Sequence, residues 1–326
     1  MIIALLMLSS CVVENKKNLY EKEEISSESL KKYKKLESNF FDNDISYNKD
    51  MTILGKKLFY DNDLSENKSL SCNSCHSLET AGADIYRFSK INTEEFTSRN
   101  TPTIFNSAGN KYLSWDGEFT SIEEKVVDSL LSSEEMGIKN KDVILTIISS
   151  KEEYRESFKL LFPNSEESIS IHNIATAIGS YVRTLATPSK WDLFLAGDYD
   201  ILSGEEKHGF NLFDDYGCGT CHNGELLGGD KLTKLGMSMP WPTDSDYGRF
   251  NLTKDESDKM IFKVPSLRNC TATPPYFHNG SEASLEEAII MMGYYQLGKS
   301  ISDEEASAIK SWLGSTAGIL SGYGNH

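Results

Sequence analysis

Two five-residue stretches constrain this chain more than any other feature: Cys72-Asn73-Ser74-Cys75-His76 and Cys218-Gly219-Thr220-Cys221-His222. In each, the spacing lets two thiols bond to the vinyl groups of one haem while the adjoining imidazole reaches its iron. The chain has only six Cys and six His in 326 residues, so two chance occurrences are not expected. We therefore predict two haem c groups. The residues predicted to hold them are Cys72, Cys75, His76, Cys218, Cys221 and His222.

Zinc is the main alternative, because pairs of Cys-x-x-Cys also form zinc sites. Zinc ribbons place their two pairs roughly 15–20 residues apart and need no adjacent histidine. Here the pairs begin at positions 72 and 218, and a histidine follows each of them. Both observations favour haem.

The composition is that of a soluble globular protein, with 39% hydrophobic and 25% charged residues. The length suffices for two domains that each bury a core. No run approaches the ~20 apolar residues that a membrane-spanning helix needs. The net charge of −16 argues against nucleic acid as a partner and weakly favours a basic protein or a small neutral substrate.

The N-terminus suggests export. Residues 1–10 are short and apolar, and Leu8-Ser9-Ser10-Cys11 resembles the lipobox of bacterial lipoproteins. We expect a signal peptide over 1–10, a lipid anchor at Cys11, and a polar tether over 11–50 that holds the protein to the membrane in the periplasm. The basic residues usual before such a stretch are missing, and the alternative is a frayed apolar end with a stray cysteine.

The rest of the chain is predicted to be mainly α. Apolar residues recur at helical spacing, and alternating strand patterns are almost absent. Thr187-Pro188 ends a helix and marks the predicted boundary between domains 51–188 and 189–326. Four helices are expected to begin with capping boxes. The Ser and Glu pairs are Ser121 with Glu124, Ser203 with Glu206, Ser284 with Glu287, and Ser302 with Glu305.

Ordered motifs from about Thr52 to Gly314 resemble the bacterial di-haem cytochrome c peroxidase family. They are Leu70-Ser71-Cys72-x-x-Cys75-His76, Arg99-Asn100-x-Pro102-Thr103, Trp115-Asp116-Gly117, Glu135-Met136, the second Cys-x-x-Cys-His, Pro265-x-Leu267-Arg268-Asn269, Pro275-Tyr276-Phe277-His278-x-Gly280, Met292-Gly293 and Gln296-Leu297-Gly298. The resemblance implies two cytochrome c-like domains, each carrying one covalently attached haem c. It also implies reduction of hydrogen peroxide to water, with electrons from a small periplasmic cytochrome c or copper protein. A homodimer is one candidate assembly.

The resemblance also implies roles for single residues. His76 would be the proximal ligand of the peroxidatic haem, and His222 with Met292 would hold the electron-transferring haem. Glu135 matches the family's acid/base carboxylate, and Trp115 matches an indole between the haems. Lys125 occupies the position of a family glutamine in the distal pocket, and the sequence leaves open whether it lines that pocket.

Calcium ligands are implied as well. Asn100, Thr273 and Pro275 match positions that supply an amide oxygen and two carbonyl oxygens to a calcium ion between the domains. Hard oxygen donors suit Ca²⁺. His278 matches a position near that interface with no certain role.

Two other functions remain open. The methylamine-utilisation branch of this superfamily uses peroxide to oxidise a partner protein, but it has a Tyr where this chain has Met292. A pure electron carrier is the second alternative, although it would have both irons six-coordinate. In addition, many family members block the peroxidatic iron with a second His. Asn92 stands at that position, and no His occurs between His76 and His172.

Overall fold

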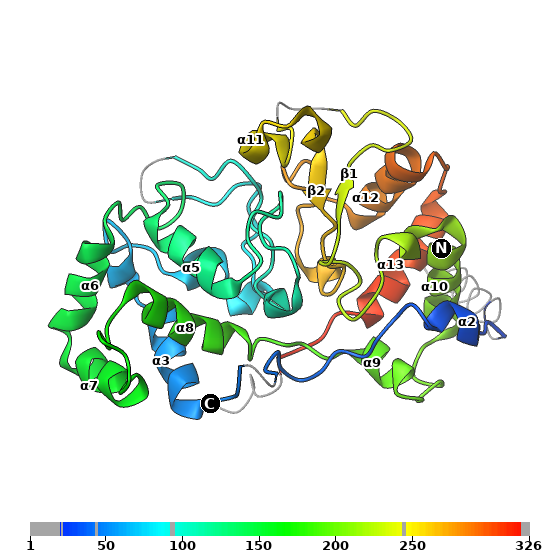
Figure 1. The fold of residues 1–326 in the computed structure, drawn as a ribbon. Helices are drawn as coiled ribbons and strands as arrows, with labels where there is room; N and C mark the ends of the chain where they lie inside the picture. The colour runs from blue at the N-terminus through cyan, green and yellow to red at the C-terminus, as the bar shows by residue number, and fades with distance from the viewer. Residues whose placement is uncertain (1–19, 21, 43–44, 92–94, 243–245, 321–326) are drawn as a thin grey trace, which may run out of the picture.

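The computed structural model describes residues 20, 22–42, 45–91, 95–242 and 246–320. Helices dominate it, and its only regular sheet in these residues is one short antiparallel pair. The elements group into two lobes (Figure 1). One hydrophobic cluster draws its buried residues from positions 54–185, and a second draws them from Tyr33 and positions 191–313. We call these the N-terminal and C-terminal lobes.

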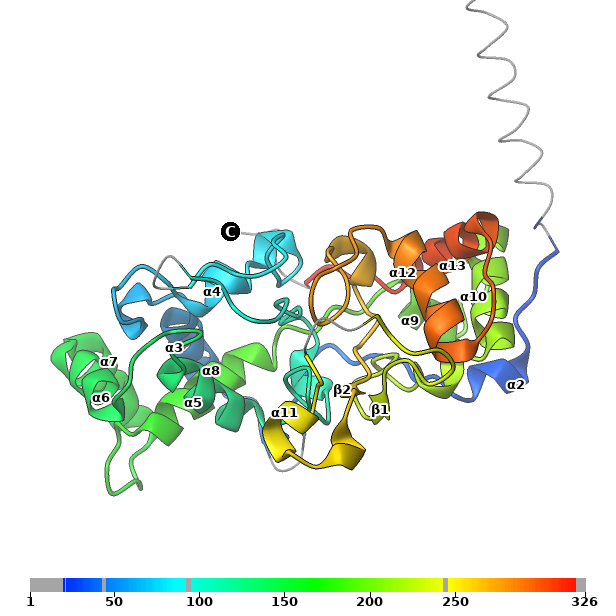
Figure 2. The same ribbon diagram turned by 90° about the horizontal axis from the view of Figure 1, so that it is seen from above.

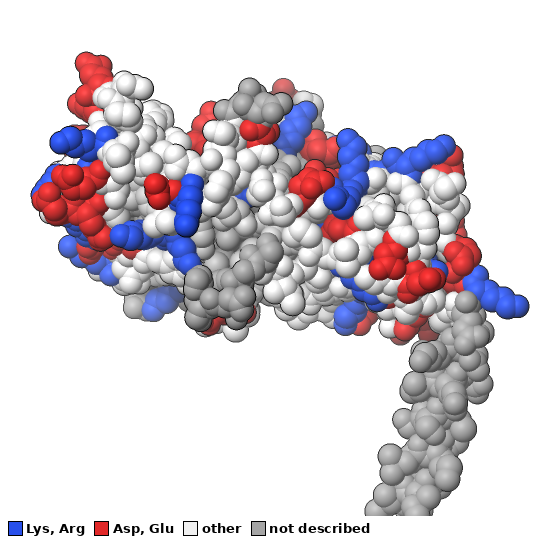
Figure 3. Space-filling model, turned by 90° about the horizontal axis from the view of Figure 1, so that it is seen from below, with Lys and Arg blue, Asp and Glu red and all other residues white. Residues whose placement is uncertain are grey.

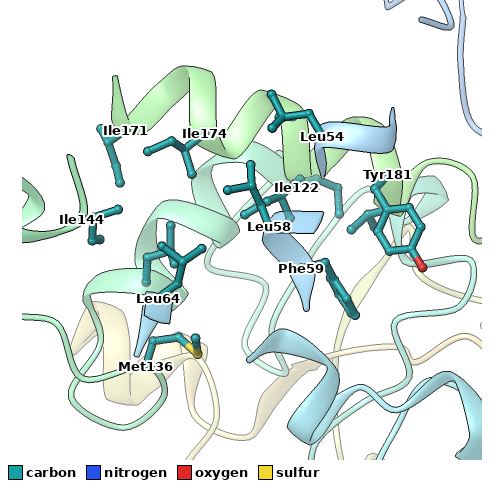
Figure 4. Packing of buried hydrophobic residues seen from close by; sticks show 14 of the residues in the cluster. Leu54, Leu58, Phe59, Leu64, Ile122, Met136, Ile144, Ile171, Ile174 and Tyr181 are labelled. Carbon is teal, nitrogen blue, oxygen red and sulfur yellow. The ribbon is translucent and has the colours of Figure 1, made fainter. Parts of the chain in front are cut away.

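The N-terminal lobe is built on two helices that pack closely, α3 and α8 (Figure 1). Gly55 permits this approach, since a Cβ there would lie 1.8 Å from the Ala177 carbonyl oxygen. Figure 4 shows the apolar side chains that fill the space beside them, with Met136 at the edge of the group. The elements of this lobe are α3 (Lys49–Phe59), η1 (Asn62–Leu64), α4 (Cys72–Cys75), η2 (Leu78–Thr80), η3 (Ser107–Gly109), α5 (Ile122–Leu131), α6 (Lys141–Ser150), α7 (Glu152–Leu161) and α8 (Ile171–Val182).

The C-terminal lobe is built in the same way, on two closely packed helices, α10 and α13. A Cβ on Gly209 would lie 1.9 Å from the Ala308 carbonyl oxygen, so glycine again sets the distance between the helices. Trp191 and Trp312 are fully buried beside them, with ring centroids 5.4 Å apart. The elements are α9 (Lys190–Leu195), α10 (Gly204–Tyr216), η4 (Cys218–Thr220), β1 (Leu232–Lys234), α11 (Phe250–Thr253), η5 (Glu256–Asp258), β2 (Ile261–Lys263), η6 (Cys270–Ala272), α12 (Leu285–Met291), the π-helical η7 (Met292–Leu297) and α13 (Asp303–Ser315).

All four helices predicted from their caps are present, as α5, α10, α12 and α13. Reciprocal capping boxes form at α10 and α13. At α5 and α12 only half of the box forms: the serine hydroxyl accepts from the backbone amide of Glu124 or Glu287 as predicted, but it donates to the carboxylate of Glu123 or Glu286, and no return bond from the predicted glutamate side chain is formed. Helix α7 was not among the expected helices.

The segment before α3 differs from the solvated tether that we expected. Over 22–42, which includes α2 (Ser27–Leu30), the chain crosses the C-terminal lobe towards the N-terminal one (Figure 1). Tyr33 and Leu36 are only 6% and 2% exposed, and the Leu36 amide donates to Asp192 Oδ1 at 2.7 Å. Asp192 also forms a buried ion pair with Arg268. Two apolar anchors thus bind a polar segment to the folded protein.

The lobes meet through backbone hydrogen bonds. The Asn100 amide donates to the His278 carbonyl at 2.8 Å, and the Lys263 amide donates to the Trp115 carbonyl at 2.7 Å. Seen from above, β1 and β2 lie between the two groups of helices (Figure 2). On the face seen from below, acidic and basic side chains are interspersed (Figure 3). Among the described residues, no helix combines the length and apolarity needed to cross a bilayer.

Candidate functional site

The first Cys-x-x-Cys-His stretch begins a short helix, α4, whose end presents the histidine. His76 follows α4 directly, and its Nδ1 lies 3.2 Å from the carbonyl oxygen of Gly82. Gly82 has φ +77°, a conformation that L side chains rarely adopt, so the turn that brings this carbonyl back requires glycine. With Nδ1 donating, Nε2 carries the lone pair that an iron ion needs.

The second stretch has the same arrangement on a different local structure. Helix α10 ends at Tyr216, Gly217 turns the chain with φ 91°, and the cysteines follow on and after η4. His222 Nδ1 lies 3.2 Å from the carbonyl oxygen of Leu227. Burial lowers the pKa of His222 to about 4, so its ring is neutral and able to bind a metal.

The cysteines of both stretches fit thioether attachment. All five described cysteines are free of disulfides. Burial raises the pKa of Cys72 to about 12, of Cys75 to about 11 and of Cys218 to about 12. These are neutral thiols held next to an oriented imidazole, which is the donor set that haem c requires.

The structure brings Glu135 and Lys125 together beside the first stretch. Lys125 lies on α5 and Glu135 in the turn after it, with Lys125 Nζ 2.6 Å from Glu135 Oε1. The same ammonium lies 2.9 Å from Asp128 Oδ2. Lys125 therefore points towards Glu135 in the structure.

The charge state of Glu135 follows from this contact. Burial would raise its pKa, but the Lys125 ammonium and a hydrogen bond from Ser129 hold the pKa below its usual value. The carboxylate in turn acts electrostatically on His76 and Cys72, so it lies near the first attachment stretch. Lys125 thus keeps the Glu135 carboxylate ionised near the buried His76.

Trp115 lies where the lobes meet. Its indole Nε1 donates to the Asn100 carbonyl at 2.8 Å, and its ring meets that of His278 edge-on with centroids 6.3 Å apart. His278 is 2% exposed and stacks on Phe262 at 4.3 Å. These contacts fix the orientation of the Trp115 ring at the interface.

Met292 stands where α12 changes from α- to π-helical geometry. Helix α12 ends at Met291, and η7 begins at Met292. Such π-helical turns are rare and occur often at functional sites, because they redirect a side chain without breaking the helix. Gln296, further along η7, holds the turn by bonding the Gly236 amide and the Lys234 carbonyl.

The residues expected to bind calcium lie on both sides of the interface. Asn100 is 7% exposed, and its Nδ2 donates to the Tyr86 carbonyl at 3.1 Å, so its Oδ1 points the other way. Thr273 follows η6 in the C-terminal lobe, and Pro275 is joined to Pro274 by a cis peptide bond.

Some residues fall outside these findings or were not anticipated. Asn92 and Cys11 lie outside the described residues. Cys270 is buried in the C-terminal lobe. The carbonyls of Gly82 and Leu227 orient the two histidines, but a backbone acceptor leaves no signal in a sequence. Lys263, buried next to Trp115, was also missed.

A mainly helical fold with two oriented Cys-x-x-Cys-His sites defines a protein of the di-haem c type. The family model described as di-haem cytochrome c peroxidase matches residues 37–200. The chain is 38% identical over 273 residues to cytochrome c551 peroxidase of Nitrosomonas europaea, covering 83% of this chain and 81% of that one. The enzyme of the same name from Pseudomonas aeruginosa is 38% identical over 271 residues, with 81% and 78% covered. The chain belongs to the di-haem cytochrome c peroxidase family. It is a peroxidase, and its family implies two haem c groups.

Comparison with solved structures finds proteins of similar fold. A crystal structure of a MauG-like protein associated with microbial copper homeostasis superposes with a TM-score of 0.76 at 27% identity, over 89% of this chain and 96% of that one. The diheme peroxidase BthA from Burkholderia thailandensis superposes with a TM-score of 0.71 at 16% identity, over 88% and 90%, which shows the fold alone.

Proposed function

We propose that this peroxidase reduces hydrogen peroxide to water at the first attachment site, with electrons from a small cytochrome c or copper protein. The observation that carries the proposal is the ionised Glu135 beside the first stretch, held by Lys125 at 2.6 Å. A carboxylate near an open iron is what peroxide cleavage needs and what a simple electron carrier does not.

Haem c held by Cys72, Cys75 and His76 would supply an iron able to bind peroxide and pass electrons to it. Glu135 accepts the proton from the inner peroxide oxygen and returns it to the outer oxygen, which leaves as water. Two electrons and two further protons complete the reduction of one peroxide to two waters. Lys125 keeps Glu135 deprotonated, and therefore ready to accept the first proton. Acid/base help of this kind contributes roughly 10²–10⁴-fold.

The second site would store and pass electrons. His222 and Met292 would bind its iron, and a thioether opposite an imidazole raises the reduction potential. The start of a π-helical turn at Met292 supports this assignment. Trp115, fixed between the lobes by Asn100 and His278, is the proposed path for electrons from the second site to the first.

A calcium ion would join the lobes through Asn100 Oδ1 and the carbonyls of Thr273 and Pro275. The direct bond between the Asn100 amide and the His278 carbonyl brings the segments that carry these residues together. We also propose a periplasmic location with a lipid anchor at Cys11, because haem c is attached outside the cytoplasm in bacteria. A homodimer remains the candidate assembly.

A second function, oxidation of a partner protein, is favoured by one observation. The chain is 32% identical over 243 residues to methylamine utilization protein MauG of Methylophilus methylotrophus, with 72% of this chain and 70% of that one covered. Met292 argues against this function, because that branch has a tyrosine at the position.

Steady-state kinetics of the holoprotein test the proposal. Reduced cytochrome c or a reduced copper protein is mixed with hydrogen peroxide, and donor oxidation is followed optically. Two donor molecules oxidised per peroxide support the peroxide reductase. Oxidation of protein side chains without donor turnover would support the second function, and no peroxide-dependent oxidation of either would leave an electron carrier.

A further inference from the structure

Lys263 is a buried lysine without a counter-ion in the part of the chain that the structure describes. It is the last residue of β2, opposite Leu232 on β1, and only 6% of it is exposed. Its backbone amide donates to the Trp115 carbonyl at 2.7 Å, which fixes it at the contact between the lobes. Its ammonium has no hydrogen-bond acceptor and no ion pair among the described residues. A buried charge in this condition is costly unless something pairs with it.

Asp116 does not provide this counter-ion. Asp116 acts electrostatically on Lys263, but its Oδ2 accepts a hydrogen bond from Arg99 Nη1 at 2.7 Å. Arg99 also pairs with Asp246, at 2.7 Å from Nε to Oδ2. Asp116 and Asp246 therefore both pair with the guanidinium of Arg99.

The other arginine nearby, Arg249, has its own acidic partner, because its Nε lies 3.7 Å from Asp258 Oδ2. The guanidinium of Arg249 donates to the backbone carbonyls of Asp116 and Gly117, both at 3.1 Å. Burial lowers the pKa of Lys263 to about 8, as expected for an ammonium that lacks an anion. Each of these carboxylates is thus engaged by an arginine, and none of them contacts the Lys263 ammonium.

We propose that the Lys263 ammonium pairs with a propionate carboxylate of one of the two haem groups. The haems are the anions that this family brings into the fold, each with two propionates, and Lys263 lies beside Trp115, the residue between the two sites. The inference rests on the presence of haem and not on the reduction of peroxide, so it can fail while the proposed function stands.

A measurable consequence follows from charge. A cation at a propionate favours the reduced iron, since reduction adds an electron nearby. Loss of this cation should lower the reduction potential of the haem whose propionate it contacts. The other haem should change little, which will also identify the propionate's owner.

Redox titration of the purified holoprotein tests the proposal with matched variants. Lys263→Met removes the charge at similar length, and Lys263→Arg keeps the charge. Lys234→Met is the control, because Lys234 is exposed on β1 of the same sheet. We expect Lys263→Met to lower one haem potential, with Lys263→Arg and Lys234→Met close to wild type. Unchanged potentials in Lys263→Met, or an equal shift in Lys234→Met, would overturn the proposal.

A second measurement covers the case in which Lys263→Met does not fold. Infrared redox-difference spectra of the wild-type and Lys263→Arg proteins, with ¹³C-labelled propionates, report the carboxylate directly. Exchanging an ammonium for a guanidinium should shift a labelled carboxylate band of one haem. Identical labelled bands in the two proteins would rule out the contact.

Discussion

Lys125 Nζ lies 2.6 Å from Glu135 Oε1, and this contact joins a helix to the turn that follows it. The family that the sequence resembles has a glutamine, which is neutral, at the position of Lys125. Here a full positive charge faces the proposed acid/base group, with Asp128 as its other partner. In this chain Glu135 therefore forms an ion pair where the family has a neutral neighbour. Its lowered pKa should be visible in the pH dependence of the enzyme.

Glu135→Gln should slow the reaction with peroxide by about 10²-fold or more, because an amide cannot accept the proton. Stopped-flow mixing of the holoprotein with peroxide gives this rate. Glu134→Gln is the matched control, since Glu134 is exposed and its carboxylate accepts a hydrogen bond from Ser98. A normal rate in Glu135→Gln would move the acid/base role elsewhere, first to Lys125.

Lys125→Gln should shift the acidic limb of the rate profile to higher pH. The groups that act on Glu135 are Lys125, Ser129 and His76, and Lys125 is the largest of those that lower its pKa. Without this ammonium the carboxylate protonates at a higher pH, so the rate is lost earlier as the pH falls. Lys125→Arg should retain the wild-type limb. Profiles of the peroxide rate measured between acidic and neutral pH check this, and an unmoved limb in Lys125→Gln contradicts it.

Met292→Ala should lower the reduction potential of the second haem and leave peroxide binding at the first unchanged, because the thioether favours ferrous iron. Met291→Ala, one residue earlier at the end of α12, is the control. A redox titration resolves the two haems. Equal potentials in wild type and Met292→Ala would remove Met292 as a ligand.

The oxidised enzyme should react with peroxide without prior reduction. No His occurs between His76 and His172 to block the first iron, and neutral amides such as that of Asn92 are poor ligands. Three other side chains could bind the iron if the loop folded inwards: Lys90, Tyr86 and Met136. Lys90 and Tyr86 are exposed, and Met136 packs in the N-terminal core (Figure 4). Electron paramagnetic resonance should show one high-spin and one low-spin ferric haem. Two low-spin haems, inert to peroxide until reduced, would disprove the prediction.

The haem attachment sites and helix caps could be predicted from the sequence, because they depend on residues that are close together in the chain. A Cys-x-x-Cys-His stretch requires only neighbouring residues, so both attachment sites were predictable at once. The caps of α10 and α13 join residues three apart, and they formed as expected. At α5 the sequence predicted the helix and the bond from the Glu124 amide to Ser121, but not that the serine hydroxyl would donate to the neighbouring Glu123 carboxylate.

The tertiary structure decided what depends on distant partners. Tyr33 and Leu36 sit in a polar stretch that alone would remain solvated, and only contacts with residues near 192 and 224 bury them. The direction of Lys125 depended on a turn ten residues later, and Lys263 is bonded through its backbone amide to the Trp115 carbonyl in the other lobe. In the sequence each of these residues resembles ordinary polar surface, because burial and charge pairing are properties of neighbours that only folding brings together.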